Sequence, residues 1–482
     1  MSITVEANLV GGRLTTEGSG DPIPVLNPAD YSVIGHVPAM GAADVDVVLD
    51  AAVAGAKTWR STGPIARGRV LLDAAALIRA EAAELAELIV SEMGKTRAEA
   101  TGEVGKAAEF FEYYGGMGRE GFGTVIPDAR PSTFAMYVRE PIGVVLLVTP
   151  WNDPLLTPAR KMAPALIAGN AVVIKPATET PLITLKLAQI LHRAGIPEGV
   201  LGTVTGRGSE IGDLLTTDSR LAAVSFTGST SVGLGLQRKL AGSGVRVQTE
   251  MGGKNAAVVM ADADLDMITP ILMGGAFGQA GQRCTATSRL IVQRSIADEV
   301  RARVSAGLAA LRVGAGGAEG TDIGPVVSRS AQADIASRVQ AGLDEGATIV
   351  ATAPLAEGMT DTGAFVQPVL LTVDADNSLW NEEIFGPVLS MIEVEDLDEA
   401  IDYVNASAYG LSSAIYTGSL DAAFRFIDAV DTGQVSVNQP TSGWDIHQPF
   451  GGFKESGSAF KEQGSVALEF YTRVKTVAVR SR

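Results

Sequence analysis

The sequence predicts an α/β protein of more than one domain, with parallel sheets covered by helices. The chain has 482 residues, more than a single hydrophobic core usually organises. Short β-branched apolar runs alternate with helix-like stretches over residues 142–228, and the same alternation returns over residues 251–438. Strands that are apolar on both faces and separated by helices are typical of βαβ units, so each region is expected to form a parallel sheet.

The segment before the first sheet is expected to be helical over residues 42–114. Its clearest stripe has apolar residues three or four positions apart in "IARGRVLLDAAALIRAEAAELAELIVSEM" and ends at Gly94, a residue that commonly terminates helices. The Gly-Lys-Thr at this point imitates the end of a phosphate-binding loop, but Ile89 stands where such a loop needs its first glycine, so this motif is rejected. Downstream, "STFAMYVREP" alternates in polarity and predicts a strand, interpreted as an exposed hairpin arm.

The strands of the two sheets follow from their apolar runs. In the first region these are "IGVVLLVTP", "NAVVIKP" and "LAAVSFTG", with "PLITLKLAQILHRAG" as a connecting helix. In the second region they are "AAVVM", "RLIVQ", "AIYTG" and "GQVSVN". The pattern restarts near residues 250–253, which places a domain boundary there.

Composition excludes several classes of partner. The chain has 55 acidic and 38 basic side chains, a net charge of -17 that repels nucleic acids and anionic membranes, so neither is an expected partner. The first residues, "MSITVEANLVGGRL", lack the apolar core of a signal peptide, and no run of about 18 apolar residues predicts a membrane span. Cys284 is the only cysteine, which excludes an internal disulfide and fits a reducing cytoplasm.

Some chemistries are excluded by missing motifs. One cysteine and three histidines (His36, His192 and His447) give no zinc-binding spacing, so no metal is expected. No G-x-S-x-G motif is present, which argues against an α/β-hydrolase. Taken alone, Cys284 is more simply interpreted as a small buried residue than as a nucleophile.

Two stretches at predicted strand ends suit a dinucleotide. In "SFTGSTSVG", Gly228 allows a tight turn, and Ser229 with the free N–H groups of the next helix suits a phosphate. In "VVIKPATETP", Lys175 follows the carboxyl end of a parallel strand, where ligands bind in such sheets. The alternative, a common strand–helix turn and a solvated lysine, stays open from these residues alone.

Three further stretches carry groups suited to acid–base or anion chemistry. Glu250 precedes a Gly-Gly pair and an apolar strand, so a desolvated carboxylate there could act as a base, although a surface glutamate at a turn is the simpler interpretation. Asn152 in "TPWNDP" is a neutral donor that could stabilise an oxyanion. "NEEIFGPV" places Glu383 and Phe385 beside a Gly-Pro turn.

Seven motifs, in their order along the chain, resemble the aldehyde dehydrogenase superfamily: TPWNDP, KPATETP, FTGSTSVG, EMGGK, GQRC, EEIFGPV and PFGGFKESG. The spacing between Glu250 and Cys284 is also similar to that of the family, and the resemblance covers nearly the whole chain. It implies an α/β, aldehyde dehydrogenase-like fold with a Rossmann-type dinucleotide-binding domain, an α/β catalytic domain and a bridging β-hairpin. The implied bounds are 1–122 and 141–250 for the first domain, 251–452 for the second, and 123–140 and 453–482 for the bridge, in which "FYTRVKTVAV" joins the hairpin to hold a homodimer or homotetramer together.

The resemblance also implies a mechanism. Cys284, as a thiolate that is expected to be ionised near neutral pH, attacks the aldehyde carbonyl to form a thiohemiacetal, whose oxyanion is held by the Asn152 amide and the Cys284 backbone N–H. Hydride transfer to the nicotinamide of NADP or NAD leaves a thioester, and Glu250 activates the water that hydrolyses it. Lys161 is similar to a lysine near the active site of the family.

Cofactor residues are assigned by the same resemblance. Thr178 stands where many NAD-preferring relatives carry a glutamate, and loss of that charge removes a repulsion against a 2′-phosphate. NADP is therefore expected to be accepted while NAD stays open, although Glu179 restores part of the repulsion. The positions implied in cofactor binding are Trp151, Lys175, Thr178, Gly228, Ser229, Met251, Glu383 and Phe385.

The substrate is expected to be a small polar or carboxylate-bearing aldehyde. Arg160 matches an arginine that binds the substrate carboxylate in succinate-semialdehyde dehydrogenases, and "CTATSR" is similar to ketoglutarate-semialdehyde dehydrogenases. The arginine that the former enzymes often carry shortly before the cysteine is replaced by Gly278. Asp153 stands where relatives have an aromatic or apolar residue, and it is expected either to face away from the site or to bind a polar substrate.

Three alternatives stay open. Trp444 and Phe450 could line a pocket for an aromatic aldehyde. A relative that passes the thioester to coenzyme A is disfavoured, because such enzymes generally lack the glutamate base, here Glu250. A binding protein on the same fold that has lost catalysis is disfavoured because Cys284, Glu250 and Asn152 are all present.

Overall fold

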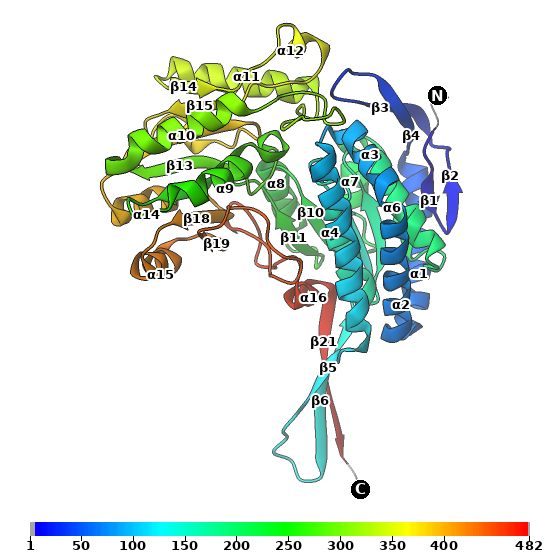
Figure 1. Ribbon diagram of the computed structural model, residues 1–482. Helices are drawn as coiled ribbons and strands as arrows, with labels where there is room; N and C mark the ends of the chain where they lie inside the picture. Colours follow the sequence, from blue (N-terminus) through cyan, green and yellow to red (C-terminus); the bar gives the residue numbers. More distant parts are fainter. Residues whose placement is uncertain (1–4, 481–482) are drawn as a thin grey trace.

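The computed structural model describes residues 5–480 and shows two α/β bodies side by side, with a narrow three-stranded arm projecting from them (Figure 1). One body holds a five-stranded sheet and the other a seven-stranded sheet. The predicted α/β class with two largely parallel sheets is therefore confirmed. Between residues 5 and 480, no helix is long and apolar enough to cross a membrane.

The first body opens with short strands and four helices. Gly94 ends α3 as predicted, because its φ of 86° is a left-handed cap that a residue without a Cβ adopts readily. The single apolar stripe predicted from 65 to 93 is two helices, since Glu81 has non-helical angles (φ −103°, ψ 13°), a break that the apolar spacing does not mark. The elements are β1 (Asn8–Val10), β2 (Arg13–Thr15), β3 (Gly20–Leu26), β4 (Val33–Ala39), α1 (Ala42–Ser61), α2 (Pro64–Ala80), α3 (Ala82–Met93) and α4 (Arg97–Gly116).

All five strands of the first sheet run parallel, in the order β11–β10–β7–β8–β9. The strand order reverses between β7 and β10, and loops that follow strands at such a point form a crevice in which ligands bind. The three predicted strands and the predicted helix are confirmed as β7, β8, β10 and α6. The strands are β7 (Val144–Val148), β8 (Ala171–Lys175), β9 (Leu201–Thr203), β10 (Leu221–Thr227) and β11 (Arg246–Glu250), and the helices are α5 (Leu156–Ile167), α6 (Pro181–Arg193), α7 (Gly208–Thr216) and α8 (Thr230–Leu240).

The second sheet has the order β14–β15–β16–β13–β12–β18–β19, in which β14, at the edge, pairs antiparallel. The four predicted strands are confirmed as β12, β13, β18 and β19, and the chain passes from the first sheet to the second between Glu250 and Asn255. The strands are β12 (Asn255–Val259), β13 (Thr287–Gln293), β14 (Thr348–Thr352), β15 (Val369–Thr372), β16 (Val388–Val394), β18 (Ser412–Tyr416) and β19 (Gln434–Val437), and the helices of eight or more residues are α9 (Leu265–Phe277), α10 (Ala297–Ala310), α11 (Arg329–Asp344), α14 (Leu397–Asn405) and α15 (Leu420–Ala429).

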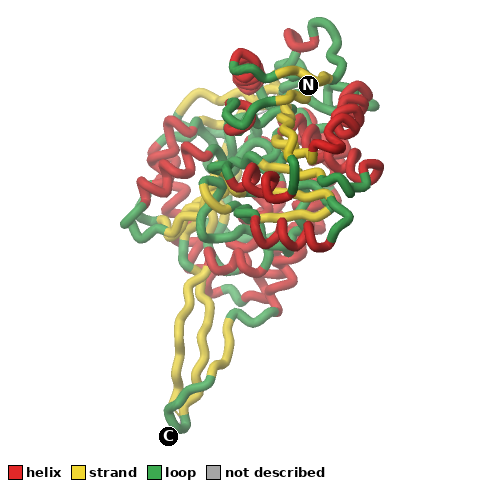
Figure 2. Tube along the Cα trace, turned by 90° about the vertical axis from the view of Figure 1, so that its left-hand side faces the viewer, coloured by secondary structure: helices red, strands yellow, loops and turns green. Residues whose placement is uncertain are grey.

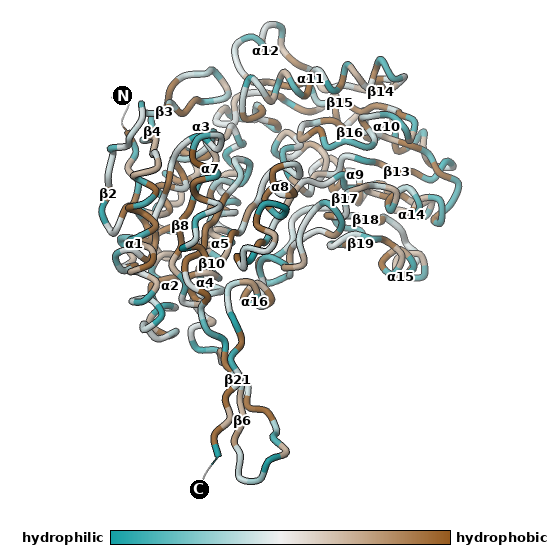
Figure 3. Tube along the Cα trace, turned by 180° about the vertical axis from the view of Figure 1, so that it is seen from behind, coloured by the Kyte–Doolittle hydropathy of each residue, from teal (hydrophilic) through white to brown (hydrophobic). Residues whose placement is uncertain are grey.

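The arm consists of β5 (Gly123–Ile126), β6 (Thr133–Pro141) and β21 (Thr472–Arg480), and Figure 2 shows its strands extending well beyond the two bodies. β21 pairs antiparallel with β6 over nine residue pairs, so the predicted hairpin and the C-terminal segment form one sheet. Hydrophobic and hydrophilic stretches both occur along it (Figure 3). Its exposed large apolar side chains are Val125, Phe134, Val474 and Val479.

The residues just before β21 do not belong to the arm. The short strand β20 (Phe453–Lys454) pairs with β17 (Tyr409–Gly410) in the second body. After it, α16 (Leu468–Tyr471) packs against α5 in the first body. This part of the segment 453–482 therefore joins the two bodies and brings its side chains close to the site described next.

Candidate active site

A cavity of about 560 Å³ lies where the loops after β7 and β10 face the second body. These loops flank the point at which the strand order of the first sheet reverses, so the cavity occupies the crevice expected for a ligand. Its walls also include α4, the loop that carries the cysteine, and residues 383–385. Nine of the predicted site residues line it, namely Trp151, Asn152, Arg160, Gly228, Ser229, Met251, Cys284, Glu383 and Phe385.

Three predicted site residues lie off the cavity wall. Lys175 ends β8, the neighbour of β7, and its Nζ donates to the carbonyl oxygen of Pro176 at 3.2 Å. The Thr178 hydroxyl, in the loop that follows, donates to the carbonyl oxygen of Gly206 at 3.5 Å. The third, Glu250, is buried and is not among the residues that line the cavity.

Cys284 is half-buried in a loop whose backbone is held in an unusual conformation. Gln279 and Ala280 have φ values of 54° and 53°, a region that residues with a Cβ seldom adopt and that is often found at functional sites. Asn255 anchors the other side of the loop, because its Nδ2 donates to the carbonyl oxygens of Cys284 and Ala286, both at 2.8 Å. The thiol is thus fixed at the cavity wall by its backbone.

The electrostatic surroundings of Cys284 favour the neutral thiol in the protein alone. Burial raises the pKa of the Cys284 thiol to about 12, and the Arg160 guanidinium lowers it only in part. The thiolate expected at neutral pH is therefore not the resting form of the ligand-free protein. An additional positive charge beside the sulfur would favour ionisation.

Asn152 lies beside the cysteine loop and has a hydrogen-bond donor to spare. Its side chain is 5% exposed, and its Nδ2 donates to the carbonyl oxygen of Gln282 at 3.0 Å. An amide nitrogen carries two N–H groups, so one remains for an oxygen bound in the cavity. A neutral donor in this position suits an oxyanion.

Glu250 ends β11 and is 2% exposed, yet neither of its carboxylate oxygens has a hydrogen bond in the part of the chain that the structure describes. Gly451 makes room for it, because a Cβ there would sit 2.5 Å from Oε1. Burial, and then the nearby Glu462 carboxylate, raise the pKa of Glu250 well above its ordinary value. Buried polar atoms are seldom left without a partner, so this carboxyl has both oxygens free to bind water or a ligand.

Arg160 belongs to a buried cluster of charges that the sequence does not indicate. Its Nε lies 2.9 Å from Oε2 of Glu462, in a geometry that makes an ion pair rather than an aligned hydrogen bond. The other oxygen of Glu462 accepts from Lys161, whose Nζ also donates to the Ser225 hydroxyl at 2.7 Å. The guanidinium of Arg160 stacks over the Phe450 ring at 4.7 Å. Two cations share one carboxylate, so the cluster contributes positive charge to the cavity wall.

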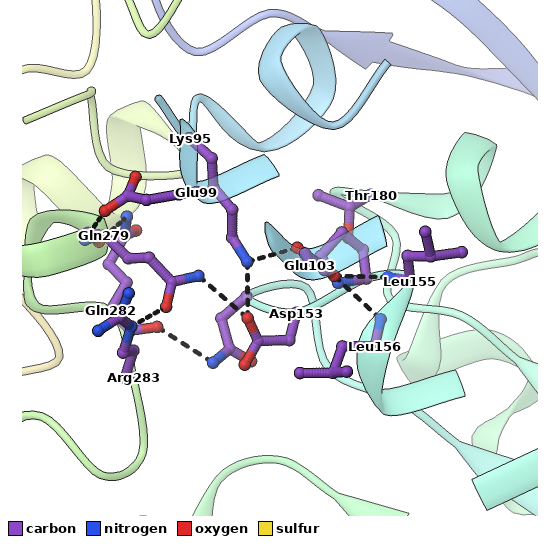
Figure 4. A network of polar contacts seen from close by, with 12 residues as sticks. Lys95, Glu99, Glu103, Asp153, Leu155, Leu156, Thr180, Gln279, Gln282 and Arg283 are labelled. Atoms are coloured by element: carbon purple, nitrogen blue, oxygen red, sulfur yellow. Dashed lines mark hydrogen bonds and ion pairs between the residues drawn. The ribbon is translucent and has the colours of Figure 1, made fainter. Parts of the chain in front are cut away.

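Asp153 lines the cavity, so the expectation that it faces away is wrong. Its carboxylate accepts from the Lys95 ammonium at 2.6 Å and from the Gln279 amide at 3.0 Å, and both contacts can be followed in Figure 4. Lys95 also pairs with Glu103 at 2.5 Å. Burial alone would raise the pKa of Asp153, but the Lys95 ammonium outweighs it and lowers that pKa to about 2. Asp153 is thus a charged, paired part of the wall.

Another group of residues on the cavity wall suits a dinucleotide. Ser229 is the N-cap of α8 and makes no side-chain cap, which leaves first-turn N–H groups for a phosphate. The Trp151 and Phe385 rings meet edge to face at 5.2 Å, and Phe385 adopts a strained φ of 52°. Glu383 accepts from the N–H of Gly253 at 2.9 Å, and burial raises the pKa of Glu383 to about 7. Aromatic rings, a helix N-terminus and a carboxylate are groups that hold a ring, a phosphate and a ribose, respectively.

Comparison with known proteins agrees with this geometry. A model of the aldehyde dehydrogenase family matches residues 15–477. Among curated relatives, 2,5-dioxopentanoate dehydrogenase of Saccharolobus solfataricus is 42% identical, over 96% of this chain and 97% of the relative. α-Ketoglutarate semialdehyde dehydrogenase of Haloferax volcanii is 41% identical, over 98% of each chain. A crystal structure of betaine aldehyde dehydrogenase from Staphylococcus aureus in complex with NAD+ superposes with a TM-score of 0.95 at 30% identity, covering 98% of this chain and 94% of that one.

Proposed function

This chain belongs to the aldehyde dehydrogenase family and is an NAD(P)-dependent aldehyde dehydrogenase, and from that premise we propose that Cys284 is its nucleophile and a carboxylate-bearing semialdehyde its substrate. The observation that carries the proposal is that Cys284 and Arg160 line one cavity. A guanidinium binds a carboxylate strongly, so an aldehyde with an acid group can be held with its carbonyl at the sulfur.

In the first half of the reaction the Cys284 thiol loses its proton to solvent, and the thiolate sulfur attacks the aldehyde carbon while the electron pair of the C=O bond moves to the oxygen. The free N–H of Asn152, together with the backbone N–H of Cys284, stabilises the resulting oxyanion. When bound, NAD(P)+ supplies the hydride acceptor that converts the thiohemiacetal into a thioester. Trp151, Ser229, Glu383 and Phe385 are the wall residues that would hold it.

In the second half Glu250 removes a proton from the water that hydrolyses the thioester. The pKa of its carboxyl is raised by burial, so the carboxylate is a stronger base than that of an exposed glutamate. Its unpartnered oxygens leave it free to bind that water. The presence of Glu250 supports hydrolysis of the thioester rather than transfer to coenzyme A.

The relatives named for 2,5-dioxopentanoate and α-ketoglutarate semialdehyde support a substrate with a terminal carboxylate. We propose that NADP is accepted as well as NAD, because Thr178 puts no carboxylate beside a 2′-phosphate. An aromatic aldehyde is the second candidate, since Trp444 and Phe450 both line the cavity.

A panel of aldehydes, run with both cofactors and without coenzyme A, tests this function. We expect kcat/KM for 2,5-dioxopentanoate to exceed that for pentanal, an uncharged aldehyde of the same length, by roughly tenfold or more, the effect of one good charge-assisted contact. A higher kcat/KM for phenylacetaldehyde overturns the carboxylate assignment. A requirement for coenzyme A overturns the hydrolytic one.

We also propose that the chain acts in the cytoplasm as a homodimer or homotetramer. Its single cysteine suits a reducing compartment. Exposed Val125, Phe134, Val474 and Val479 on the arm give a second subunit an apolar surface to cover. The proposed domain bounds are those implied by the resemblance, with residues 453–471 placed between the bodies rather than in the arm.

A further inference from the structure

Arg283, the residue before Cys284, brings a second guanidinium to the cavity wall. It packs over Gly278, since a Cβ there would sit 3.2 Å from its Nη1 and 3.4 Å from its Cζ. Its Nε donates to the side-chain oxygen of Gln279. Within residues 5–480 it has no carboxylate partner within 4.0 Å, and its two Nη groups make no hydrogen bond.

The direction of this side chain is set by a chain of hydrogen bonds (Figure 4). Lys95 keeps Asp153 ionised, and the Asp153 carboxylate accepts from the NH2 group of Gln279. That contact turns the amide so that its oxygen faces Arg283, because the two ends of an amide have opposite roles. The backbone N–H of Gln279 is held in turn by the Glu99 carboxylate at 2.6 Å.

No acid within residues 5–480 forms an ion pair with Arg283. Asp153 and Glu103 are both paired with Lys95, and the Glu99 carboxylate accepts from the backbone N–H groups of Thr96 and Gln279. The Arg283 guanidinium is therefore an unpaired cation in a protein of net charge -17, on the residue next to the nucleophile. Its two Nη groups are free to bind a ligand. A carboxylate matches them, because it accepts two parallel N–H···O bonds.

We propose that Arg283 determines specificity by binding the substrate carboxylate, and that Asp153 and Gln279 are positioning residues that aim it. This inference rests on the proposed function and adds a second cation to the one that Arg160 supplies. It also gives Asp153 a role, because the Asp153 carboxylate, through Gln279, orients the Arg283 guanidinium that binds the substrate carboxylate.

The test compares kcat and KM for 2,5-dioxopentanoate and pentanal in the wild type, Arg283→Gln, Arg283→Lys and Gln279→Met. Lys106→Met is the matched control, because Lys106 also lines the cavity without an ion pair in the described chain. Arg283→Gln is expected to raise KM for 2,5-dioxopentanoate roughly 10- to 100-fold and to leave kcat/KM for pentanal within about twofold. Arg283→Lys is expected to recover part of the loss, and Gln279→Met to show a smaller loss with the same selectivity for the charged substrate.

Turnover of pentanal shows that each variant is folded. The inference is overturned if Arg283→Gln retains the preference for the charged aldehyde, or if Lys106→Met loses it equally. A wild-type enzyme without that preference overturns the proposed substrate class before any variant is measured, so the two failures are distinct.

Discussion

Replacing Gly451 by alanine tests whether the Glu250 carboxyl must hold its buried position for the second half of the reaction. A Cβ at position 451 would lie 2.5 Å from Oε1 of Glu250 and 3.3 Å from its Cδ, so one group has to move. The backbone here is held, because Phe450 and Glu462 exchange N–H···O bonds of 2.8 and 2.7 Å and the Lys461 ammonium donates to the Gly451 carbonyl. The carboxyl, which has no hydrogen bond in residues 5–480, is the group that yields.

When a catalytic base is displaced by about 1 Å, the step that it assists slows roughly 100-fold. We expect Gly451→Ala to release a full burst of reduced cofactor in the first turnover and then to turn over roughly 100-fold more slowly than the wild type. Stopped-flow absorbance of the reduced cofactor separates the two phases. Alanine at a φ of 146° adds strain, about 1–3 kcal/mol, so the variant should also unfold at a lower temperature.

Gly346→Ala separates strain from displacement. Gly346 has a φ of 104°, and no heavy atom lies within 4 Å of the Cβ position, so alanine there is strained without pressing on a neighbour. It should keep normal steady-state turnover. Loss of the burst in Gly451→Ala, or equal slowing in Gly346→Ala, would refute the role given to the buried carboxyl.

Three further predictions address the remaining groups. Cys284→Ala should abolish turnover while cofactor binding, followed by fluorescence titration, stays near normal; retained turnover contradicts the nucleophile assignment. Thr178→Glu should raise KM for NADP roughly tenfold relative to KM for NAD, by placing a carboxylate near the 2′-phosphate, and an unchanged ratio would show that position 178 does not face it. Deacylation works only with ionised Glu250, so its rate should rise with pH through a value above the ordinary pKa of a carboxyl; a half-maximum near pH 4 contradicts the burial argument.

Much of the fold could be predicted from local patterns. The strands β7, β8, β10, β12 and β13 are apolar on both faces, and that signal depends only on neighbours in the sequence. The break at Glu81 could not be predicted, since it carries neither glycine nor proline and the apolar spacing continues across it. Pairing of β21 with β6 was indicated by resemblance alone, because 300 residues and more separate the partners.

Site residues in local motifs could likewise be predicted, whereas those that depend on partners distant in the sequence could not. Cys284 and Asn152 stand in recognisable motifs, and both lie on the cavity wall. Glu462 gives no such signal, because its partner Lys161 lies 301 residues away and the pair exists only once α5 and the C-terminal segment meet. Asp153 looked anomalous because its partner Lys95 lies 58 residues earlier in the sequence. Gly278 replaces an arginine that similar enzymes often carry. The space that a side chain at position 278 would enter is occupied by the Arg283 guanidinium.

Burial disfavours the charged form of both reacting groups in the ligand-free protein, and this affects the order in which the ligands bind. The pKa of the Cys284 thiol is raised to about 12, and the pKa of Glu250 is also raised, in each case mainly by burial. A thiol with so high a pKa is almost entirely protonated at pH 7, so it reacts slowly with electrophiles. An oxidised nicotinamide brings a positive charge, which stabilises the thiolate, so cofactor should bind before aldehyde.

Alkylation by iodoacetamide measures the reactivity of the thiol directly, since Cys284 is the only cysteine. The alkylation rate should rise about tenfold per pH unit in the free enzyme and should increase when NAD(P)+ is added. A rate that is independent of pH between 6 and 9, or that cofactor lowers without blocking access, would contradict a neutral resting thiol.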